Sequence, residues 1–381
     1  MNILMVVSWY TPMGREKLEA GVFHYEQSMD LKKKGCNVAI YFPFDTEIQN
    51  EETCKDEWGL LTYRSHYEVG NVLATQKRMK KTFARIVKEF KPHVIHAHCG
   101  GAAGFYSVPL SKKYGIPMVV TEHSPLELTK VDHFGLPYLM TKRAYGHSKM
   151  NVCVSKDSMN KLSKVYPKYP FDVIYNGIIL PRYKDTHVHY RDGYINIAIV
   201  AILYDKEIKG MQHLLPAMRL LKDKGQKVIL HHIGAGQFLE YYKNMSKELG
   251  IDDIVEFHGS CQREELYEIV NEMDFFVSAS LFECSGVSVQ EAMLLGKPIL
   301  GTNSGGVDSL VPEKAGYIVQ KGSDKALAEG IDYMIGHLEK FDFDWIKNYA
   351  YKHFEIGHIS EKYIELYKKI LGGQENEDTI C

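Results

Sequence analysis

Residues 275–306 read FFVSASLFECSGVSVQEAMLLGKPILGTNSGG. The apolar run 275–278 predicts a strand, and the small, turn-forming residues 284–286 predict a loop that leads into a helix over 287–295. A second apolar run, 298–301, predicts the next strand. A strand, a crossover helix and a further strand make the unit from which parallel α/β sheets are built.

Short runs rich in Val and Ile alternate with longer segments of helical periodicity along nearly the whole chain. Further strands are predicted at 3–7, 38–42, 94–96, 118–121, 151–154, 173–175, 195–202, 228–233 and 254–257. Such alternation is typical of parallel sheets joined by crossover helices. The fold class is therefore α/β, with two doubly wound, Rossmann-like domains in tandem.

The boundary between the two domains is predicted within 177–193, where Asn-Gly, Pro, Arg, Asp and His gather and the periodicity fails. We expect a first domain over 1–178 and a second over 179–356. The last helical stretch, about 357–371, is expected to pack back on the first domain. The polar residues 372–381 are expected to form a flexible tail.

Length and composition describe an ordinary globular protein. The 381 residues are 45% hydrophobic and 25% charged, which excludes wholesale disorder, collagen-like repeats and a coiled coil. The formal net charge of −2 gives no overall signal for a membrane, and no nucleic-acid partner is expected. However, residues 1–180 carry a formal +7 and residues 181–381 a formal −9. This split favours an anionic partner for the first half, although two solvated surfaces of different composition would also produce it.

Cysteine usage and the N-terminus bear on the compartment. The seven cysteines are odd in number and form no C-x-x-C pair, which is typical of a reducing environment. The N-terminal MNILMVV indicates a first strand rather than a signal peptide. No run approaches the ~20 apolar residues of a membrane span. We therefore expect a cytoplasmic protein, at most peripheral on the inner face of the membrane.

The loop before the helix at 287–295 is the strongest candidate for chemistry. Ligands of open parallel sheets bind beyond the carboxyl ends of the strands, and a helix start favours an anion. Glu283 lies just before this helix and Glu291 within it. A nucleotide-sugar fits that layout if Glu291 meets its hydroxyls and Glu283 faces the group beyond its phosphates. Taken alone, two ordinary surface or capping glutamates would be the simpler interpretation.

A longer pattern surrounds the two glutamates. Glu283-x7-Glu291 is followed by Ala292, Met293, Gly296, Pro298, Thr302, Gly305 and Gly306. Elsewhere the chain contains, in order, SWYTP, AGVFHYEQ, KPHVIHAHCGGAAG, IPMVVTEHS, VCVSKDSM, VIYNGI and IKGMQHLLPA. Together these motifs resemble the family 4 retaining glycosyltransferases (glycosyl transferases group 1). That family has the GT-B fold, in which two Rossmann-like domains face a central cleft.

The resemblance implies a role for each matching residue of the second domain, which binds the nucleotide-sugar in this family. Glu291 would hold the ribose and Glu283 would contact the donor sugar. Lys209 would hold the diphosphate and offset the negative charge that grows on the departing nucleotide. Backbone groups of Gly286, Val287 and Ser288 would meet the sugar and phosphates.

The first domain binds the acceptor in this family. Gly21 stands where a family glycine lets the backbone approach the donor phosphate, and His123 where a histidine lies beside the reaction centre. His96 and His98 flank one residue of a predicted strand, so both side chains point to the same face. We expect His96 to pack in the interior and His98 to line the acceptor cleft. A zinc pair is the alternative for these two, but the sequence shows no third ligand.

The sequence departs from the family at two positions. Counting back from Lys209 puts Ile202 or Leu203 where the family usually has an arginine, so one of two phosphate-binding cations is missing. The family's Gly-Gly-x-x-Glu has Ser309 in place of the glutamate. We expect no metal or other cofactor.

The resemblance implies a hexosyltransferase-type enzyme that transfers a sugar with retention. A UDP-sugar is the favoured donor. A glycan or lipid-linked acceptor is expected, in cell-surface polysaccharide or glycoconjugate synthesis.

Two other functions compete with this one. Gly234-x-Gly236 after a strand, with Glu256 twenty residues on, imitates a dinucleotide-binding fingerprint, but Leu239 replaces its third glycine. A nicotinamide dehydrogenase is therefore disfavoured. A catalytically weak transferase-fold partner protein is the second alternative, motivated by the missing arginine.

The segment 77–91 holds seven Lys or Arg against one Glu. Apolar residues fall on one face of the predicted helix, and Lys77, Lys81, Arg85 and Lys88 fall on another. A core helix with a solvated basic side would show this pattern. Docking on an anionic membrane surface, to meet a lipid-linked acceptor, is the functional alternative.

Overall fold

The computed structural model describes residues 1–10, 22–55, 59–129, 131, 134–180, 182 and 193–377, with the backbone alone for 373–377. The chain divides into two compact units. Unit 1 comprises Met1–Gly177 together with Ile356–Cys381, and unit 2 comprises Ile178–Glu355. These divisions lie close to the boundaries at 178/179 and 356/357 that the sequence suggested.

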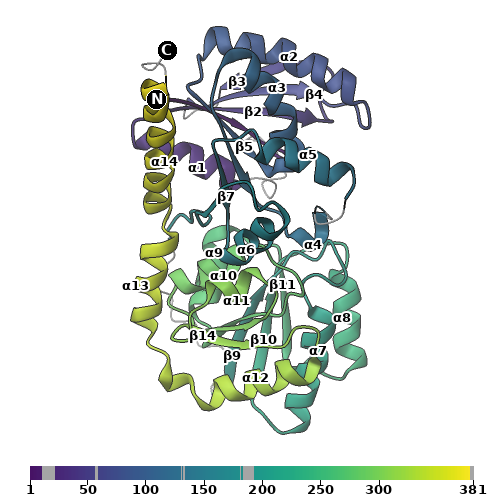
Figure 1. The fold of residues 1–381 in the computed structure, drawn as a ribbon. Coiled ribbons are helices and arrows are strands. Elements are labelled where there is room, and N and C mark those ends of the chain that lie inside the picture. Colours follow the sequence, from purple (N-terminus) through teal and green to yellow (C-terminus); the bar gives the residue numbers. More distant parts are fainter. Residues whose placement is uncertain are drawn as a thin grey trace. The chain divides into compact units, whose positions relative to one another are not determined.

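Unit 1 contains an eight-stranded sheet in the order β3-β4-β2-β1-β5-β6-β7-β8, flanked by helices (Figure 1). Its neighbouring strands run parallel except for β3 and β4. Its elements are β1 (Asn2–Val6), α1 (Val22–Lys33), β2 (Asn37–Asp45), β3 (Glu52–Lys55), β4 (Leu61–His66), α2 (Val72–Glu89), β5 (Val94–His98), the π-helical turn η1 (Cys99–Gly104), α3 (Phe105–Tyr114), β6 (Met118–Glu122), α4 (Leu126–Thr129), α5 (Leu136–Tyr145), β7 (Met150–Cys153), α6 (Lys156–Val165), β8 (Phe171–Val173) and α14 (Ile356–Glu377).

Unit 2 contains a six-stranded, fully parallel sheet in the order β11-β10-β9-β12-β13-β14. The order runs outward on both sides of the β9–β12 pair, so this unit is doubly wound, as predicted. Its elements are β9 (Ile195–Val200), α7 (Met211–Asp223), β10 (Val228–Ile233), α8 (Leu239–Glu248), β11 (Val255–Gly259), α9 (Arg263–Asn271), β12 (Phe275–Ser278), α10 (Val287–Leu294), β13 (Ile299–Thr302), α11 (Gly306–Leu310), β14 (Gly316–Val319), α12 (Asp324–Gly336), the 3-10 turn η2 (Leu338–Lys340) and α13 (Phe343–Phe354).

The C-terminal helix α14 belongs to unit 1 although it follows unit 2 in the chain. It packs next to α1 (Figure 1). Its Tyr363 and Tyr367 are buried in the hydrophobic cluster that contains Ile3 and Met5 of β1. The prediction that the helix ends at Leu371 is wrong, because α14 continues to Glu377. The rest of the predicted tail, 378–381, lies outside the described residues. In the described part of the chain, no helix is long and apolar enough to cross a bilayer.

Three strands were not predicted. β3 and β14 are edge strands of four residues, too short for a periodic signal. β4 reads LTYRSH, which is polar, yet its four central residues are buried. The strand predicted at 173–175 lies at Phe171–Val173 instead.

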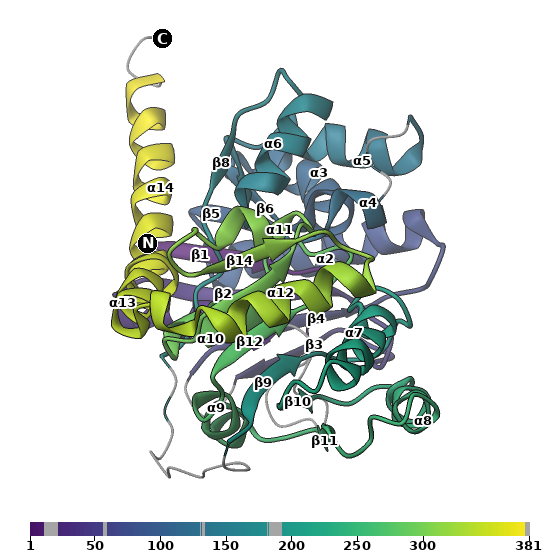
Figure 2. The same cartoon turned by 90° about the horizontal axis from the view of Figure 1, so that it is seen from below.

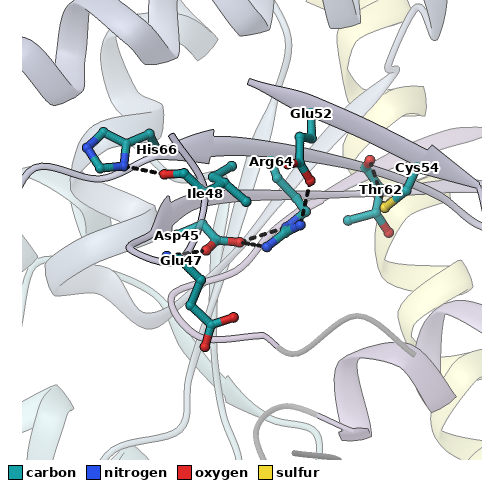
Figure 3. A network of polar contacts seen from close by, with 8 residues as sticks. All are labelled: Asp45, Glu47, Ile48, Glu52, Cys54, Thr62, Arg64 and His66. Atoms are coloured by element: carbon teal, nitrogen blue, oxygen red, sulfur yellow. Dashed lines mark hydrogen bonds and ion pairs between the residues drawn. The ribbon is translucent and has the colours of Figure 1, made fainter. Parts of the chain in front are cut away.

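A buried ion pair explains how a strand as polar as β4 lies inside unit 1. Arg64 of β4 donates from Nε to Asp45 Oδ2 at the end of β2, at 2.7 Å, and from Nη1 to Glu52 of β3, at 2.7 Å (Figure 3). The side chains of Arg64 and Asp45 are 4% and 3% exposed, whereas that of Glu52 is 51% exposed. One guanidinium therefore ties together the three strands at this edge of the sheet (Figure 3).

Arg64→Ala should destabilise unit 1 by about 3–5 kcal/mol, because it leaves the Asp45 carboxylate buried and uncompensated. Urea denaturation of the full chain measures this loss. Glu52→Gln is the matched control and should cost less than about 1 kcal/mol, since that carboxylate faces solvent. Equal effects of the two substitutions would contradict the role given to the buried pair.

Candidate functional site

An ion pair lies beyond the carboxyl ends of two adjacent strands of unit 2. Lys209 stands between β9 and α7, and Glu283 stands between β12 and α10. Lys209 Nζ is 2.9 Å from Glu283 Oε2, and Ser280 Oγ donates to the same oxygen at 3.3 Å. The two side chains are 32% and 20% exposed, so a ligand can reach both a cation and a carboxylate here.

The backbone holds Glu283 in place. Its N–H donates to Ser304 O at 3.2 Å, and its carbonyl accepts from Gly306 N–H at 2.7 Å. Gly306 has no room for a side chain, since a Cβ there would lie 2.7 Å from Glu283 O. The glycines that follow β13 in the sequence signature therefore fix the carboxylate that precedes α10.

The N-terminus of α10 opens next to this carboxylate. Gly286 precedes the helix with φ +66°, and no side chain caps the helix start among the described residues. A Cβ at Gly286 would lie 3.6 Å from Glu283 Cγ, so the helix start and the glutamate are in close proximity. Val287 and Ser288 begin the helix with partly or fully exposed side chains. The first N–H groups of α10 therefore form an anion-attracting end beside Lys209.

Glu291 is held by α9. Its Oε1 accepts from Tyr267 OH at 2.9 Å and from Arg263 Nη2 at 3.2 Å, and Arg263 Nε donates to Tyr267 OH at 2.7 Å. The side chain is only 14% exposed, and burial raises the pKa of Tyr267. Glu291 is thus a fixed acceptor and not a loosely solvated carboxylate. Arg263 and Tyr267 were not among the residues expected at this site, although their i,i+4 spacing, which puts them on one face of α9, was the available signal.

The structure distinguishes between Ile202 and Leu203 as the position where the family usually has an arginine. Leu203 is fully buried, and its backbone bonds to Ala235 O and to Phe238 N–H. Ile202 is 40% exposed. A cation at 203 would point into the core, so the departure concerns Ile202. Gly236 stands close by, and a Cβ there would lie 2.5 Å from Leu203 O, so this glycine serves tight packing between the loops after β9 and β10.

In unit 1, His123 follows β6 on a loop that one carboxylate organises. Glu122 is buried, and its Oε1 accepts from the N–H groups of His123 and Ser124, both at 3.1 Å. Its Oε2 accepts from Tyr145 OH at 2.7 Å and from Gly100 N–H at 3.0 Å. Four hydrogen bonds to one carboxylate keep the loop that carries His123 in a single conformation. A small pocket opens beside His123, lined by Phe23, Gln27, Tyr175, Asn176, Gly177 and Tyr363.

His98 and His123 are brought together, and a third histidine joins them. His98 Nδ1 and His123 Nε2 are 2.9 Å apart, and the ring of His24 lies 4.3 Å from that of His98. The three residues each offer a ring nitrogen within 4.8 Å of the others, a spacing that could hold a metal ion. Neither nitrogen of His24 has a hydrogen-bond partner among the described residues. The third imidazole that the sequence did not reveal is therefore His24.

His96 is an interior residue, as expected. Its Nε2 lies 2.7 Å from Thr121 Oγ1, and its Nδ1 lies 2.6 Å from Tyr367 OH of α14. Both ring nitrogens are occupied by protein groups, so His96 offers no ligand atom to the three-histidine cluster, although its ring lies 4.2 Å from that of His98. Gly21 lies outside the described residues.

Comparison with known proteins decides the family. Residues 20–182 match the model described as Glycosyltransferase Family 4, and residues 192–351 match the one described as Glycosyl transferases group 1. The chain belongs to the family 4 glycosyltransferases of GT-B fold.

Individual relatives agree with this assignment. The "Putative teichuronic acid biosynthesis glycosyltransferase TuaC" of Bacillus subtilis is 25% identical over 358 residues, 87% of this chain and 88% of that protein. Alpha-monoglucosyldiacylglycerol synthase of Streptococcus pneumoniae is 23% identical over 75% of this chain and 68% of its own.

Solved structures share the fold of this glycosyltransferase. Sucrose-phosphate synthase from Thermosynechococcus elongatus has a TM-score of 0.81 at 16% identity, covering 98% of this chain and 100% of that one. HepE of Anabaena in complex with UDP has a TM-score of 0.74 at 16% identity, covering 97% and 100%. The prediction of two Rossmann-like domains of GT-B type is confirmed.

The buried histidines of this glycosyltransferase are held neutral. Burial, reinforced by neighbouring imidazoles, lowers the pKa of His24 and His98 well below the ordinary value, and burial lowers the pKa of His96 and His123 to about 3. Below pH ~6.5 these histidines are protonated in the unfolded chain but not in the folded one. Their contribution to the stability of unit 1 is therefore complete at neutral pH and is lost as the pH falls.

We expect the thermal midpoint of unit 1 to fall steeply between pH 7 and pH 5. Each such histidine lowers the free energy of unfolding by up to about 1.4 kcal/mol per pH unit below its unfolded pKa. Scanning calorimetry over this range measures the slope. His24→Phe removes one titrating ring without breaking a hydrogen bond and should reduce the slope, whereas His337→Gln on the surface of unit 2 should not. A midpoint independent of pH would show that these histidines are charged in the folded state.

Proposed function

We propose that this glycosyltransferase moves a sugar from a nucleotide-sugar, a UDP-sugar in the first instance, to a glycan or lipid-linked acceptor. Unit 2 would bind the donor and unit 1 the acceptor. The observation that carries the proposal is the Lys209–Glu283 pair beside the uncapped start of α10. It combines a cation and free N–H groups for a diphosphate with a carboxylate for sugar hydroxyls.

The donor would bind in the following arrangement. The donor diphosphate would pair with Lys209 Nζ in place of Glu283. It would also accept hydrogen bonds from the backbone N–H groups of Val287 and Ser288. The Glu283 carboxylate, released from the ammonium, accepts hydrogen bonds from the sugar. The ribose hydroxyls donate to Glu291, which α9 already holds in place. HepE, which shares the fold, was solved with UDP and with UDP-glucose, and this favours UDP as the nucleotide.

Transfer would proceed with retention of the anomeric configuration. The acceptor hydroxyl attacks the face that the nucleotide leaves, and its proton passes to the departing phosphate oxygen. Lys209 and the dipole of α10 offset the charge that develops on that phosphate, so the reaction requires no metal. His123, on the loop that Glu122 holds, would be the catalytic residue of unit 1. His98 is fully buried and would reach the acceptor site only through its contact with His123.

The related proteins suggest the product class. TuaC is named for teichuronic acid biosynthesis and the Streptococcus pneumoniae relative for a glycolipid. These names support a role in cell-surface polysaccharide or glycoconjugate synthesis. The exposed apolar Ile202, where the family has a cation, favours a second candidate, a weakly active partner protein that binds a donor without turning it over.

Lys209→Met and Glu283→Gln should each lower the rate of sugar transfer, or of donor hydrolysis, by about 10²–10³-fold, because each removes a group aimed at the reacting region. Release of the nucleotide by the purified protein measures both. Lys206→Met is the matched control, since that ammonium lies over the ring of Tyr241, 4.2 Å from its centroid, and should leave the rate unchanged. Unchanged rates in both site variants would refute the assignment.

A thermal-shift screen across nucleotide-sugars should identify the donor. A donor present at 100 times its dissociation constant stabilises the protein by ~2.7 kcal/mol. A thermal shift with neither sugar transfer to an acceptor nor hydrolysis of the donor would favour the partner-protein function.

Helix α2 is the proposed membrane-docking element. Its apolar face is core, because Met79, Phe83 and Ile86 are buried, while Lys77, Lys80 and Lys81 are exposed. Next to these lysines, Val69, Val72 and Leu73 at the start of the helix are exposed by 77%, 44% and 80%. A basic face bordered by exposed apolar side chains suits an anionic bilayer surface, where a lipid-linked acceptor would be found.

Flotation with liposomes should show preferential binding to anionic over neutral lipid, and Lys77→Glu combined with Lys81→Glu should abolish the preference. Lys112→Glu with Lys113→Glu, an equal charge change on α3, should preserve it. Equal binding of the wild-type protein to both lipids would contradict the docking role of α2.

A further inference from the structure

A second cluster of potential metal ligands lies on the sheet of unit 2 and shares no residue with the proposed donor site. It consists of His231 on β10 together with Glu256 and His258 on β11. β11 is the outermost strand of this sheet, beside β10 (Figure 2). Glu256 is the residue that imitated the acidic position of a dinucleotide fingerprint in the sequence. In the folded chain it faces a histidine of the neighbouring strand.

Strand register brings the three side chains together. His231 and Glu256 are direct partners in the parallel pairing of β10 with β11, so they lie on the same face of the sheet. The register then skips His258, since the next partners are His232 with Phe257 and Ile233 with Gly259. Such a bulge re-aims a side chain, and here the ring of His258 stacks on that of His231, with centroids 5.3 Å apart.

The distances between ligand atoms suit a tetrahedral ion. His231 Nδ1 is 3.0 Å from His258 Nε2 and 3.5 Å from Glu256 Oε2. All three atoms lie within 4.8 Å of one another. Bonds of about 2.0–2.1 Å from a tetrahedral Zn²⁺ to nitrogen and oxygen place neighbouring ligand atoms roughly 3.3 Å apart. The cluster therefore needs only small side-chain movements to close around an ion.

A further residue orients His231. Asn196 on β9 donates from Nδ2 to Tyr194 O at 3.2 Å, which leaves its Oδ1 toward His231 Nε2, at 3.1 Å. An amide oxygen only accepts, so His231 carries its proton on Nε2 and presents the lone pair of Nδ1 to His258 and Glu256. A ligating histidine whose other nitrogen donates to a fixed oxygen is the usual arrangement in zinc sites.

Access to the cluster is open on one side. His231 is fully buried and His258 is half-buried, whereas the Glu256 side chain is 43% exposed. An ion can thus enter past Glu256, and water can occupy a fourth position there.

We propose that His231, Glu256 and His258 bind one Zn²⁺ ion, with water as the fourth ligand and Asn196 as the positioning residue. Two imidazoles and a carboxylate are a ligand set that zinc favours. The bound ion joins the edge strand β11 to β10 and stabilises unit 2. This site is independent of the transfer reaction.

Zinc titration of the chelator-treated full-length protein, in competition with a chromogenic chelator, tests the proposal. We expect the wild-type protein to bind one ion. Glu256→Gln and His258→Ala should lose affinity for zinc, and Asn196→Ala should weaken binding by about 10–100-fold. Zinc should raise the thermal midpoint of the wild-type protein and leave that of His258→Ala unchanged. Co²⁺ in place of zinc should give the visible absorption of a four-coordinate ion.

Glu256→Gln tests the ligand without disturbing the fold, because this side chain is 43% exposed and its replacement is isosteric. His337→Ala, which removes a histidine of unit 2 outside the cluster, should bind zinc as the wild-type protein does. If zinc were held by His24, His98 and His123 instead, the variants at Asn196, Glu256 and His258 would bind it with unchanged affinity. That result, or a wild-type protein whose midpoint does not respond to zinc, would overturn the proposal.

Discussion

The backbone of Glu283 is fixed by two hydrogen bonds, and the geometry of the candidate site in unit 2 depends on that fixation. Its N–H and carbonyl both bond to the segment after β13, and a glycine at 306 is required for the approach. This arrangement sets Glu283 between the ammonium of Lys209 and the open start of α10. A parallel sheet brings the carboxyl ends of β9, β12 and β13 to one edge, so Lys209 and Glu283, 74 positions apart in the chain, meet there.

Unit 1 achieves fixation by a different route. A single buried carboxylate, Glu122, gathers four donors and holds the loop of His123, while burial keeps the neighbouring imidazoles neutral. Neutral imidazole can donate one hydrogen bond and accept another, which suits contact with sugar hydroxyls better than a charged ring that only donates. The same burial is expected to make unit 1 less stable in acid, because the unfolded chain binds protons that the buried imidazoles do not.

Much of the fold could be predicted from the sequence, because buried parallel strands read as apolar runs between helical segments. The strand β4 could not, since its Arg64 is neutralised by Asp45, a residue with no periodic relation to it. The candidate site residues Glu283, Glu291 and Lys209 could be proposed because each lies in a local motif. Arg263, Tyr267 and His24 were missed because each acts through a contact between separate elements. The cluster around His231 was missed for the same reason, as it depends on strand register and a bulge.

The central claim is that this chain transfers a sugar from a nucleotide-sugar with retention at the anomeric carbon. The most direct measurement follows the anomeric proton by NMR while the purified protein consumes a UDP-sugar. We expect UDP to be released and the first product to have the anomeric configuration of the donor. A first product of inverted configuration, or no consumption of any nucleotide-sugar, would contradict it.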